Sequence, residues 1–194
     1  MKSLLRIVLF GVALLLLAFP VAALPALQHS HFEGIEVVRT EGHNVAFTRV
    51  EIYASKHFTN FGNVSTVWLV AEFGGDPAWK VRYSIDTTFS VPLDADYLEV
   101  TDDLGWGGLD AEVVVPVQVL TCTDTVGGNC TTSMSTTPVT IHLYGFADQE
   151  VVHSSRLMFE RRAVFTGTVT IGSRTFPYNG VWGRNYADQY TEES

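Results

Sequence analysis

The sequence predicts an all-β fold, a single antiparallel β-sandwich, with a closed β-barrel as the alternative. Apolar and polar residues alternate through most of the chain, with frequent Val, Thr and aromatic residues, a pattern typical of half-buried strands. Short stretches rich in Gly, Asn, Asp and Pro interrupt this alternation at regular intervals, as turns do. After residue 23, no stretch shows the 3.6-residue repeat of an amphipathic helix.

Five strands are predicted in the first half of the domain. The third is a clear example, because Val67, Leu69 and Ala71 share one face and polar residues lie between them. Turn residues at 42–44 separate the first two strands, and the Gly-Gly-Asp-Pro stretch at 74–77 separates the third from the fourth. The fifth strand is short and precedes an Asp-rich turn. These strands are expected at 35–40, 45–54, 65–73, 79–85 and 97–101.

Five more strands are predicted in the second half. Pro116 lies within a run of alternating valines, and since proline has no N–H to donate, its strand is expected at an edge or a bulge. The polar stretch 130–138 is interpreted as one limb of a loop. Gly172-Ser173 and Asn179-Gly180 are predicted turns, the latter within a final hairpin followed by an ordered tail. These strands are expected at 112–120, 138–146, 150–159, 164–172 and 174–178.

The N-terminus has the layout of a secretory signal peptide. Lys2 and Arg6 precede an apolar run from Ile7 to Phe19, and small residues follow near Ala23. We predict a signal peptide at 1–23, a flexible segment at 24–33, a β-sandwich domain at 34–187 and a polar tail at 188–194. No later stretch is apolar enough to span a membrane. The protein is therefore expected to be secreted, in the periplasm or outside the cell.

Composition limits the partners. Removal of 23 of the 194 residues leaves 171, which suits one domain with a sizeable core. The full chain has 12 basic and 21 acidic residues, and the leader contains two of the basic ones. An acidic chain without a basic run is a poor candidate for binding nucleic acid.

The only two cysteines, Cys122 and Cys130, flank a Gly-Gly-Asn sequence between alternating runs. Half of a metal site is one interpretation, but thiolate zinc sites usually have closely spaced pairs of cysteines and four ligands in total. The favoured interpretation is a disulfide across the end of a hairpin, which would persist in an oxidising compartment.

Several aromatic residues are candidates for ligand binding. Trp106 lies among glycines, where it could stack against a sugar ring or fold back to cap the open end of the sandwich. Tyr178, Trp182 and Tyr186 recur every four residues in the C-terminal segment. If they are exposed they form a binding strip, whereas if they are buried they close the sandwich; we favour burial. His142 is expected on a polar sheet face, opposite to its apolar neighbours.

Two clusters could hold a metal. Asp94, Asp96, Asp102 and Asp103 offer hard oxygen ligands, which Ca²⁺ prefers, although they do not follow the EF-hand order and also suit a solvated turn. His29 and His31 could share a copper or zinc ion, but lie near the expected mature N-terminus. For neither cluster does the sequence favour metal binding over the structural explanation, which is a solvated turn for the acidic residues and a chain terminus for the histidines.

The stretches VPLDADYLEVTDDLGWGGLDAEVVVPVQV (91–119) and FERRAVFTGTVTIGSRTF (159–176) resemble small secreted bacterial β-rich proteins of unknown function. The resemblance covers residues 40–176 and rests on alternation and turn residues. It implies an exported β-rich domain, and it supplies no catalytic residue.

The sequence therefore favours a non-enzymatic, exported module that binds an extracellular ligand, either a carbohydrate or another protein. The alternative is a secreted metal-dependent or hydrolytic enzyme. The sequence contains no G-x-S-x-G nucleophile motif and no phosphate-binding glycine loop. A pocket with convergent polar groups would favour the enzyme, whereas an exposed flat patch around Trp106 or Trp182 would favour the binding module.

Overall fold

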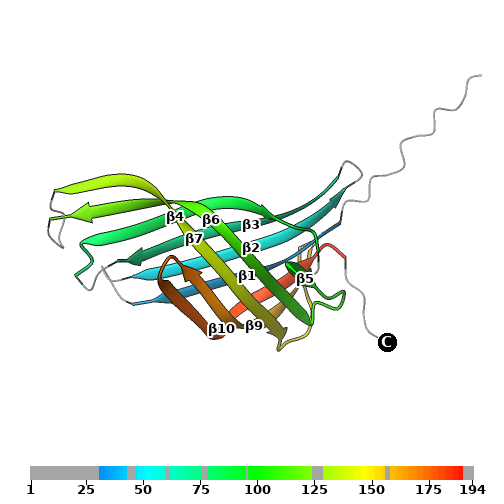
Figure 1. Cartoon of the computed structure of the whole chain (residues 1–194). Helices are drawn as coiled ribbons and strands as arrows, with labels where there is room; N and C mark the ends of the chain where they lie inside the picture. The colour runs from blue at the N-terminus through cyan, green and yellow to red at the C-terminus, as the bar shows by residue number, and fades with distance from the viewer. Residues whose placement is uncertain are drawn as a thin grey trace, which may run out of the picture.

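The computed structural model describes residues 31–42, 47–59, 62–75, 78–94, 96–123, 129–155 and 158–189 (Figure 1). These residues form an all-β antiparallel structure without a helix, which confirms the predicted fold class. No described segment is a helix that could cross a membrane. The strands are β1 (His31–Glu41), β2 (Thr48–Thr59), β3 (Gly62–Gly74), β4 (Val81–Val91), β5 (Leu98–Val100), β6 (Trp106–Cys122), β7 (Cys130–Ala147), β8 (Val152–Ser155), β9 (Met158–Ile171) and β10 (Arg174–Ala187).

All ten strands belong to one sheet, which returns on itself. The order runs β10-β1-β2-β3-β4-β6-β7-β9, and β9 also pairs with β10. The short strands β5 and β8 are added at the sides of β6 and β9. In Figure 1, β6 and β7 cross in front of β1 and β2. The single sheet therefore has two facing layers with the core between them, as the predicted sandwich requires.

The closure of this sheet is uneven. Strands β6 and β7 pair along their whole length, from Trp106 with Phe146 to Cys122 with Cys130. By contrast, β4 pairs with β6 only through Val81–Ser84. Pro116 lies in the part of β6 between the segments that pair with β4 and with β5, so β6 is paired on one side only there. This is the edge position that the sequence predicts for a proline.

The core consists of the inward-facing residues of the closed sheet. Alternation along each strand sends every second side chain inward, where burial removes apolar surface from water and stabilises the fold by roughly 1.5–3 kcal/mol per large side chain. Each of the eight strands that form the ring contributes at least one buried residue of this kind, including Val37, Ile52, Leu69, Ile85, Val115, Ile141, Phe165 and Tyr178.

Stretch 130–138 differs from the sequence-based expectation, because it forms the first half of β7 rather than a loop limb. Residues 130–136 pair with the end of β6 but are exposed, because among the described strands β9 pairs with the other side of β7 only from Val139 onward. A strand segment that is solvated on both faces needs no apolar alternation, so the pattern that marks other strands is missing here. The frequent threonines still favour an extended backbone.

The predicted turn at Asn179-Gly180 is also absent, and β10 continues through it. The register of β10 against β9 shifts between Asn179 and Val181, which identifies a β-bulge. Gly180 has a φ of +79°, so the conformational freedom expected of a turn glycine serves the bulge instead. The residues beyond the bulge pair with both β9 and β1, and this pairing favours a continuous strand over a hairpin.

The ends of the sheet refine the predicted domain limits. Strand β1 begins at His31, three residues before the start of the predicted domain, and β10 ends at Ala187, nine residues beyond the predicted last strand. Segment 150–159 is divided between β8 and the start of β9. The predicted signal peptide, residues 24–30 including His29, and residues 190–194 lie outside the described part of the chain.

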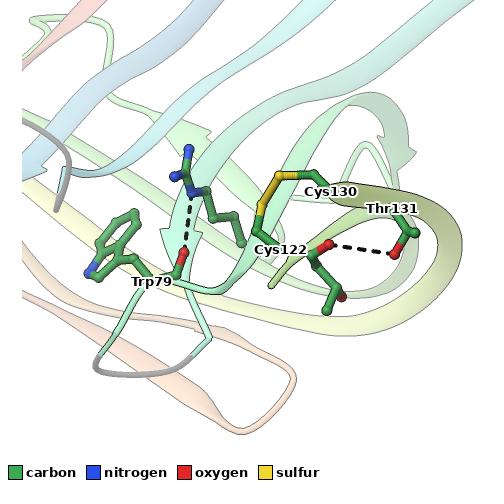
Figure 2. The surroundings of a disulfide bond; sticks show 6 residues. Trp79, Cys122, Cys130 and Thr131 are labelled. Atoms are coloured by element: carbon green, nitrogen blue, oxygen red, sulfur yellow. Dashed lines mark hydrogen bonds between the residues drawn. A yellow bond between two sulfur atoms is a disulfide. The ribbon is translucent and has the colours of Figure 1, made fainter. Parts of the chain in front are cut away.

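The disulfide between Cys122 and Cys130 is confirmed. The two residues are direct cross-strand partners at the end of the β6–β7 ribbon (Figure 2). Beside them, the Thr131 hydroxyl donates to the Thr121 carbonyl over 3.5 Å. The backbone N–H of Cys122 donates to the Lys80 carbonyl over 2.8 Å. The bridge therefore fixes the ribbon close to the start of β4.

Candidate functional site

A row of apolar side chains crosses four neighbouring strands on the outer face of the sheet. Trp106 of β6 is the register partner of Phe146 of β7, Phe146 is the partner of Val164 of β9, and Val164 is the partner of Trp182 of β10. We call these four residues the aromatic row. Phe146 is 57% exposed and Trp182 is 53% exposed. The sheet thus brings together Trp106 and Trp182, two residues that are 76 positions apart in the sequence.

Trp106 lies against the outer surface rather than capping the core. A Cβ on Gly108 would lie 2.6 Å from the tip of the Trp106 ring, so the ring folds over this glycine. It also stacks beside Tyr144, with 6.4 Å between the ring centroids. The side chain is half-buried. Gly108 therefore leaves the space in which the indole lies, whereas Gly107 faces the core, where an added Cβ would meet Asn185 and Ile35.

Trp182 marks the other end of the row. The guanidinium of Arg162 lies over its ring at 3.9 Å from the centroid, and Arg162 is held in turn by Asp148 through a 2.9 Å ion pair. Two surface grooves, of about 390 and 410 Å³, are both lined by Trp182 and Val38. Trp182 is therefore an exposed ring with a fixed partner on one side and hollows next to it.

Polar groups accompany the row on β6 and β7. Asp110 accepts a hydrogen bond from the Tyr144 hydroxyl over 2.9 Å and is paired with Nδ1 of His142. The hydrogen bond to the Asp110 carboxylate raises the pKa of Tyr144 above its usual value. His142 thus lies on the polar face, as the sequence predicts, and it has a carboxylate partner. These three side chains place hydrogen-bonding groups directly beside the aromatic rings.

The other two aromatic candidates are not part of this surface. Tyr178 is wholly buried, and its hydroxyl donates to the Val50 carbonyl over 3.2 Å. Tyr186 is half-buried, lies over Gly34 and donates to the Ala54 carbonyl over 3.3 Å. The bulge at Gly180 places Tyr178 on the opposite face from Trp182, whereas Tyr186 shares the face of Trp182 but lies outside the row.

The acidic candidates have structural partners instead of a common centre. Asp103 accepts hydrogen bonds from the Thr101 hydroxyl and the Gly105 N–H and pairs with Arg161. These contacts, the Thr101 bond above all, hold the pKa of Asp103 below its usual value. Asp94 accepts from the N–H of Asp96 over 3.2 Å, as in an Asx turn, and Asp102 is exposed.

His31 is likewise engaged, because its Nδ1 pairs with Asp188 at the end of β10. Among the residues that the structure describes, no group of three or more His, Cys, Asp or Glu side chains is placed to hold a metal ion.

Asp110 and His142 also resemble part of a catalytic relay. Thr168 is the register partner of His142 on β9, so an acid, a histidine and a hydroxyl follow one another across three strands. However, His142 is 49% exposed and the set lies on the outer face, where water competes for every contact. Neither of the grooves beside Trp182 includes any of the three. Nucleophilic catalysis requires a positioned and partly shielded base, so this arrangement favours a polar binding surface.

Sequence reasoning identified Trp106 and Trp182 but missed Phe146, Asp110 and their common face. Phe146 belonged to a correctly predicted strand, and alternation alone places it opposite to Ile141 and Leu143. What the sequence could not supply is the register between strands, which decides that Phe146 lies between Trp106 and Val164.

Comparisons of the chain with protein-family models, with curated proteins and with solved structures found no match.

Proposed function

We propose that this protein is an exported, non-enzymatic module that binds an extracellular carbohydrate on its outer sheet face. The single observation that carries the proposal is the register that aligns Trp106, Phe146, Val164 and Trp182 in one row. Aromatic rings bind the apolar faces of sugars by stacking, because the flat ring matches the axial C–H groups of a pyranose.

The dimensions of the row support an extended ligand. Neighbouring strands lie about 4.8 Å apart, so three strand spacings separate Trp106 from Trp182 by roughly 14 Å. This length exceeds that of one sugar ring, which suits a chain of linked sugars. Asp110 and Tyr144 lie next to the row and offer an acceptor and a hydroxyl for the sugar hydroxyl groups.

The disulfide supports the exported location. Disulfides persist in oxidising compartments, and the bridge joins the only two cysteines of the chain. The apolar N-terminal run with its basic flank agrees with this location.

A binding assay with a panel of polysaccharides tests the proposal. The purified protein is mixed with insoluble cellulose, chitin, xylan and peptidoglycan, and the bound fraction is measured after sedimentation. We expect retention on at least one of these polymers. Trp106→Ala and Trp182→Ala should each weaken that binding roughly 5–30-fold, equivalent to about 1–2 kcal/mol of lost stacking.

Trp68→Ala is the matched control. Trp68 is 43% exposed, stacks on Tyr53 and donates to Asp86 over 2.8 Å, but it lies on β3 and outside the row. Its replacement should leave polysaccharide binding unchanged. Absence of binding to every polymer, or an equal loss in the Trp68 variant, would contradict the proposal.

A secreted hydrolase is the second candidate, and the Asp110–His142–Thr168 alignment is the observation that favours it. Release of reducing sugar or of an ester product by the wild-type protein, abolished by His142→Ala, would establish this function. Under the binding proposal, no turnover is expected and His142→Ala affects only affinity.

A further inference from the structure

A separate hollow of about 280 Å³ lies at one end of the core, within the closed sheet. Its walls are inward-facing residues from five successive strands of the ring, together with the β9–β10 turn. Phe73, Tyr83, Val117, Thr137 and Ile171 supply these walls, and Gly172, Ser173 and Arg174 supply the turn. Such mouths of closed sheets are frequent places for small-molecule binding.

Arg174 crosses this end of the core. It belongs to β10, yet one of its terminal nitrogens donates to the Gly74 carbonyl at the end of β3, which is separated from β10 by β1 and β2 in the sheet. Its guanidinium lies 5.6 Å from the centroid of Phe73 and 5.4 Å from that of Phe176. The two rings contact each other edge-on at 5.2 Å. A long side chain is therefore held at the rim of the hollow.

The charge of Arg174 has no partner among the described acidic side chains. Several other described arginines form ion pairs with Asp or Glu side chains. No ion pair joins Arg174 to a described carboxylate. Its bond to Gly74 uses one of the five N–H donors of a guanidinium, and the residue is exposed, so further donors are accessible. A fixed cation beside apolar walls complements a ligand with an apolar body and an anionic end.

We propose that this hollow binds a small monocarboxylate with an apolar body, its carboxylate on Arg174 and its body against Phe73, Val117 and Ile171. The volume is at the lower limit of ordinary ligand pockets, roughly 300–1,000 Å³, which favours a medium-chain fatty acid or an aryl-substituted acid over a long-chain lipid. The planar guanidinium of arginine matches the geometry of a carboxylate. The site is independent of the aromatic row.

Titration calorimetry with sodium octanoate and sodium 3-phenylpropanoate tests this proposal, and the two ligands distinguish aliphatic from aromatic bodies. We expect at least one of them to bind the wild-type protein at a single site. The neutral analogues 1-octanol and 3-phenylpropanol should bind about tenfold more weakly or worse, because they forfeit a charge-assisted hydrogen bond.

Arg174→Gln should reduce carboxylate affinity about tenfold or more and remove the preference for the acid over the alcohol. Arg174→Lys should preserve most of that preference, since it keeps the charge. Thr137→Phe, which places a large side chain in the hollow and keeps the arginine, should abolish binding of both acid and alcohol. The melting temperature of each variant shows that it remains folded.

Arg162→Gln is the matched control, because Arg162 is an exposed arginine on the outer face. It should leave octanoate binding unchanged, as should Trp182→Ala. Absence of binding by either acid to the folded wild-type protein, or equal affinity for acid and alcohol, overturns the proposal. Polysaccharide binding by the Arg174→Gln variant reports on the aromatic row separately, so the two proposals can fail independently.

Discussion

Tyr178 and Tyr186 connect β10 to β2 by passing over β1 on its two faces. Tyr178 lies on the core side and donates to the Val50 carbonyl, whereas Tyr186 lies on the outer side and donates to the Ala54 carbonyl. Gly34 of β1 makes the second contact possible, since a Cβ there would lie 2.6 Å from the Tyr186 hydroxyl. Both side chains are removed from water, and burial raises the pKa of Tyr178 above its usual value and the pKa of Tyr186 to about 12.

These two tyrosines predict a loss of stability at high pH. In the unfolded chain a tyrosine releases its proton near pH 10, whereas the folded state keeps both protons. Their contribution is therefore complete below pH 10 and is lost as the pH rises from 10 towards 12. In that window the free energy of unfolding should fall by roughly 1.4 kcal/mol per pH unit for each tyrosine.

Urea unfolding at pH 8, 10 and 11 checks this prediction, with absorbance at 295 nm to follow tyrosinate. Tyr178→Phe is expected to reduce the slope with pH, although it also leaves the Val50 carbonyl without its donor. Tyr97→Phe is the control, because Tyr97 is exposed. A pH dependence that is the same in the Tyr178 and Tyr97 variants would contradict the assignment.

At the residue level, sequence alone located many important side chains but not their environments. The alternation correctly placed Val67 and Ile85 inward and His142 outward. Lys56 shows the limit of this approach: it occupies an inward position, is buried and pairs with Glu33 at 3.8 Å. A polar residue in an apolar position carries no sequence signal of its partner, since that partner is defined by cross-strand register.

Among the elements, β9 and β10 depend on two glycines in different ways. Gly167 is in the middle of β9 with a φ of +127°, and a Cβ there would lie 1.9 Å from the His142 carbonyl oxygen of β7. Gly180 forms the bulge of β10 with a φ of +79°, but the nearest atom to an added Cβ is 3.8 Å away. Gly167 therefore permits both a positive φ and the close approach of β7 to β9. Gly180 permits only a positive φ.

Gly167→Ala should therefore destabilise the protein far more than Gly180→Ala. We expect a loss of roughly 3 kcal/mol or more at position 167, where backbone strain and a backbone clash combine. At position 180 we expect about 1–2 kcal/mol, the cost of the left-handed conformation alone. Chemical denaturation of the two variants provides the comparison. Equal losses, or a larger loss at 180, would show that the β7–β9 contact is less close than described.

The elements were predictable where one face is buried and the other is solvated. All ten predicted segments overlap strands, although segment 150–159 is divided between β8 and β9. The exceptions occur where this contrast fails. Residues 130–136 are exposed on both faces, and residues 179–180 carry turn chemistry inside a strand that tertiary pairing keeps extended.

For the whole molecule, the location outside the cytoplasm remains a prediction, and intact mass tests it. Protein recovered from the culture medium or periplasm should lack residues 1–23, and its mass should be two hydrogens below that of the reduced chain. Alkylation after unfolding without reductant should add no label, since both thiols are in the disulfide. A full-length mass, or two labels, would contradict export with an intact bridge.

The global arrangement was predictable as a class and not as a topology. Composition and alternation indicated a two-layered all-β domain, but the pairing of β4 with β6 and of β10 with β1 joins segments distant in the sequence. The hollow at Arg174 depends on this closure of the sheet, whereas the aromatic row depends on the registers of β6 with β7, β7 with β9 and β9 with β10. For this reason sequence analysis named Trp106 and Trp182 singly, and gave no indication of Arg174.

The pairing of β1 with β10 also determines when the fold can be completed during synthesis. Strand β1 can pair with β10 only after β10 has left the ribosome, which happens some 140 residues later in synthesis. Until then, the nascent chain carries a free strand border at β1 that can recruit neighbouring chains. A chain cut before Arg174 keeps this border open and is therefore expected to accumulate as inclusion bodies.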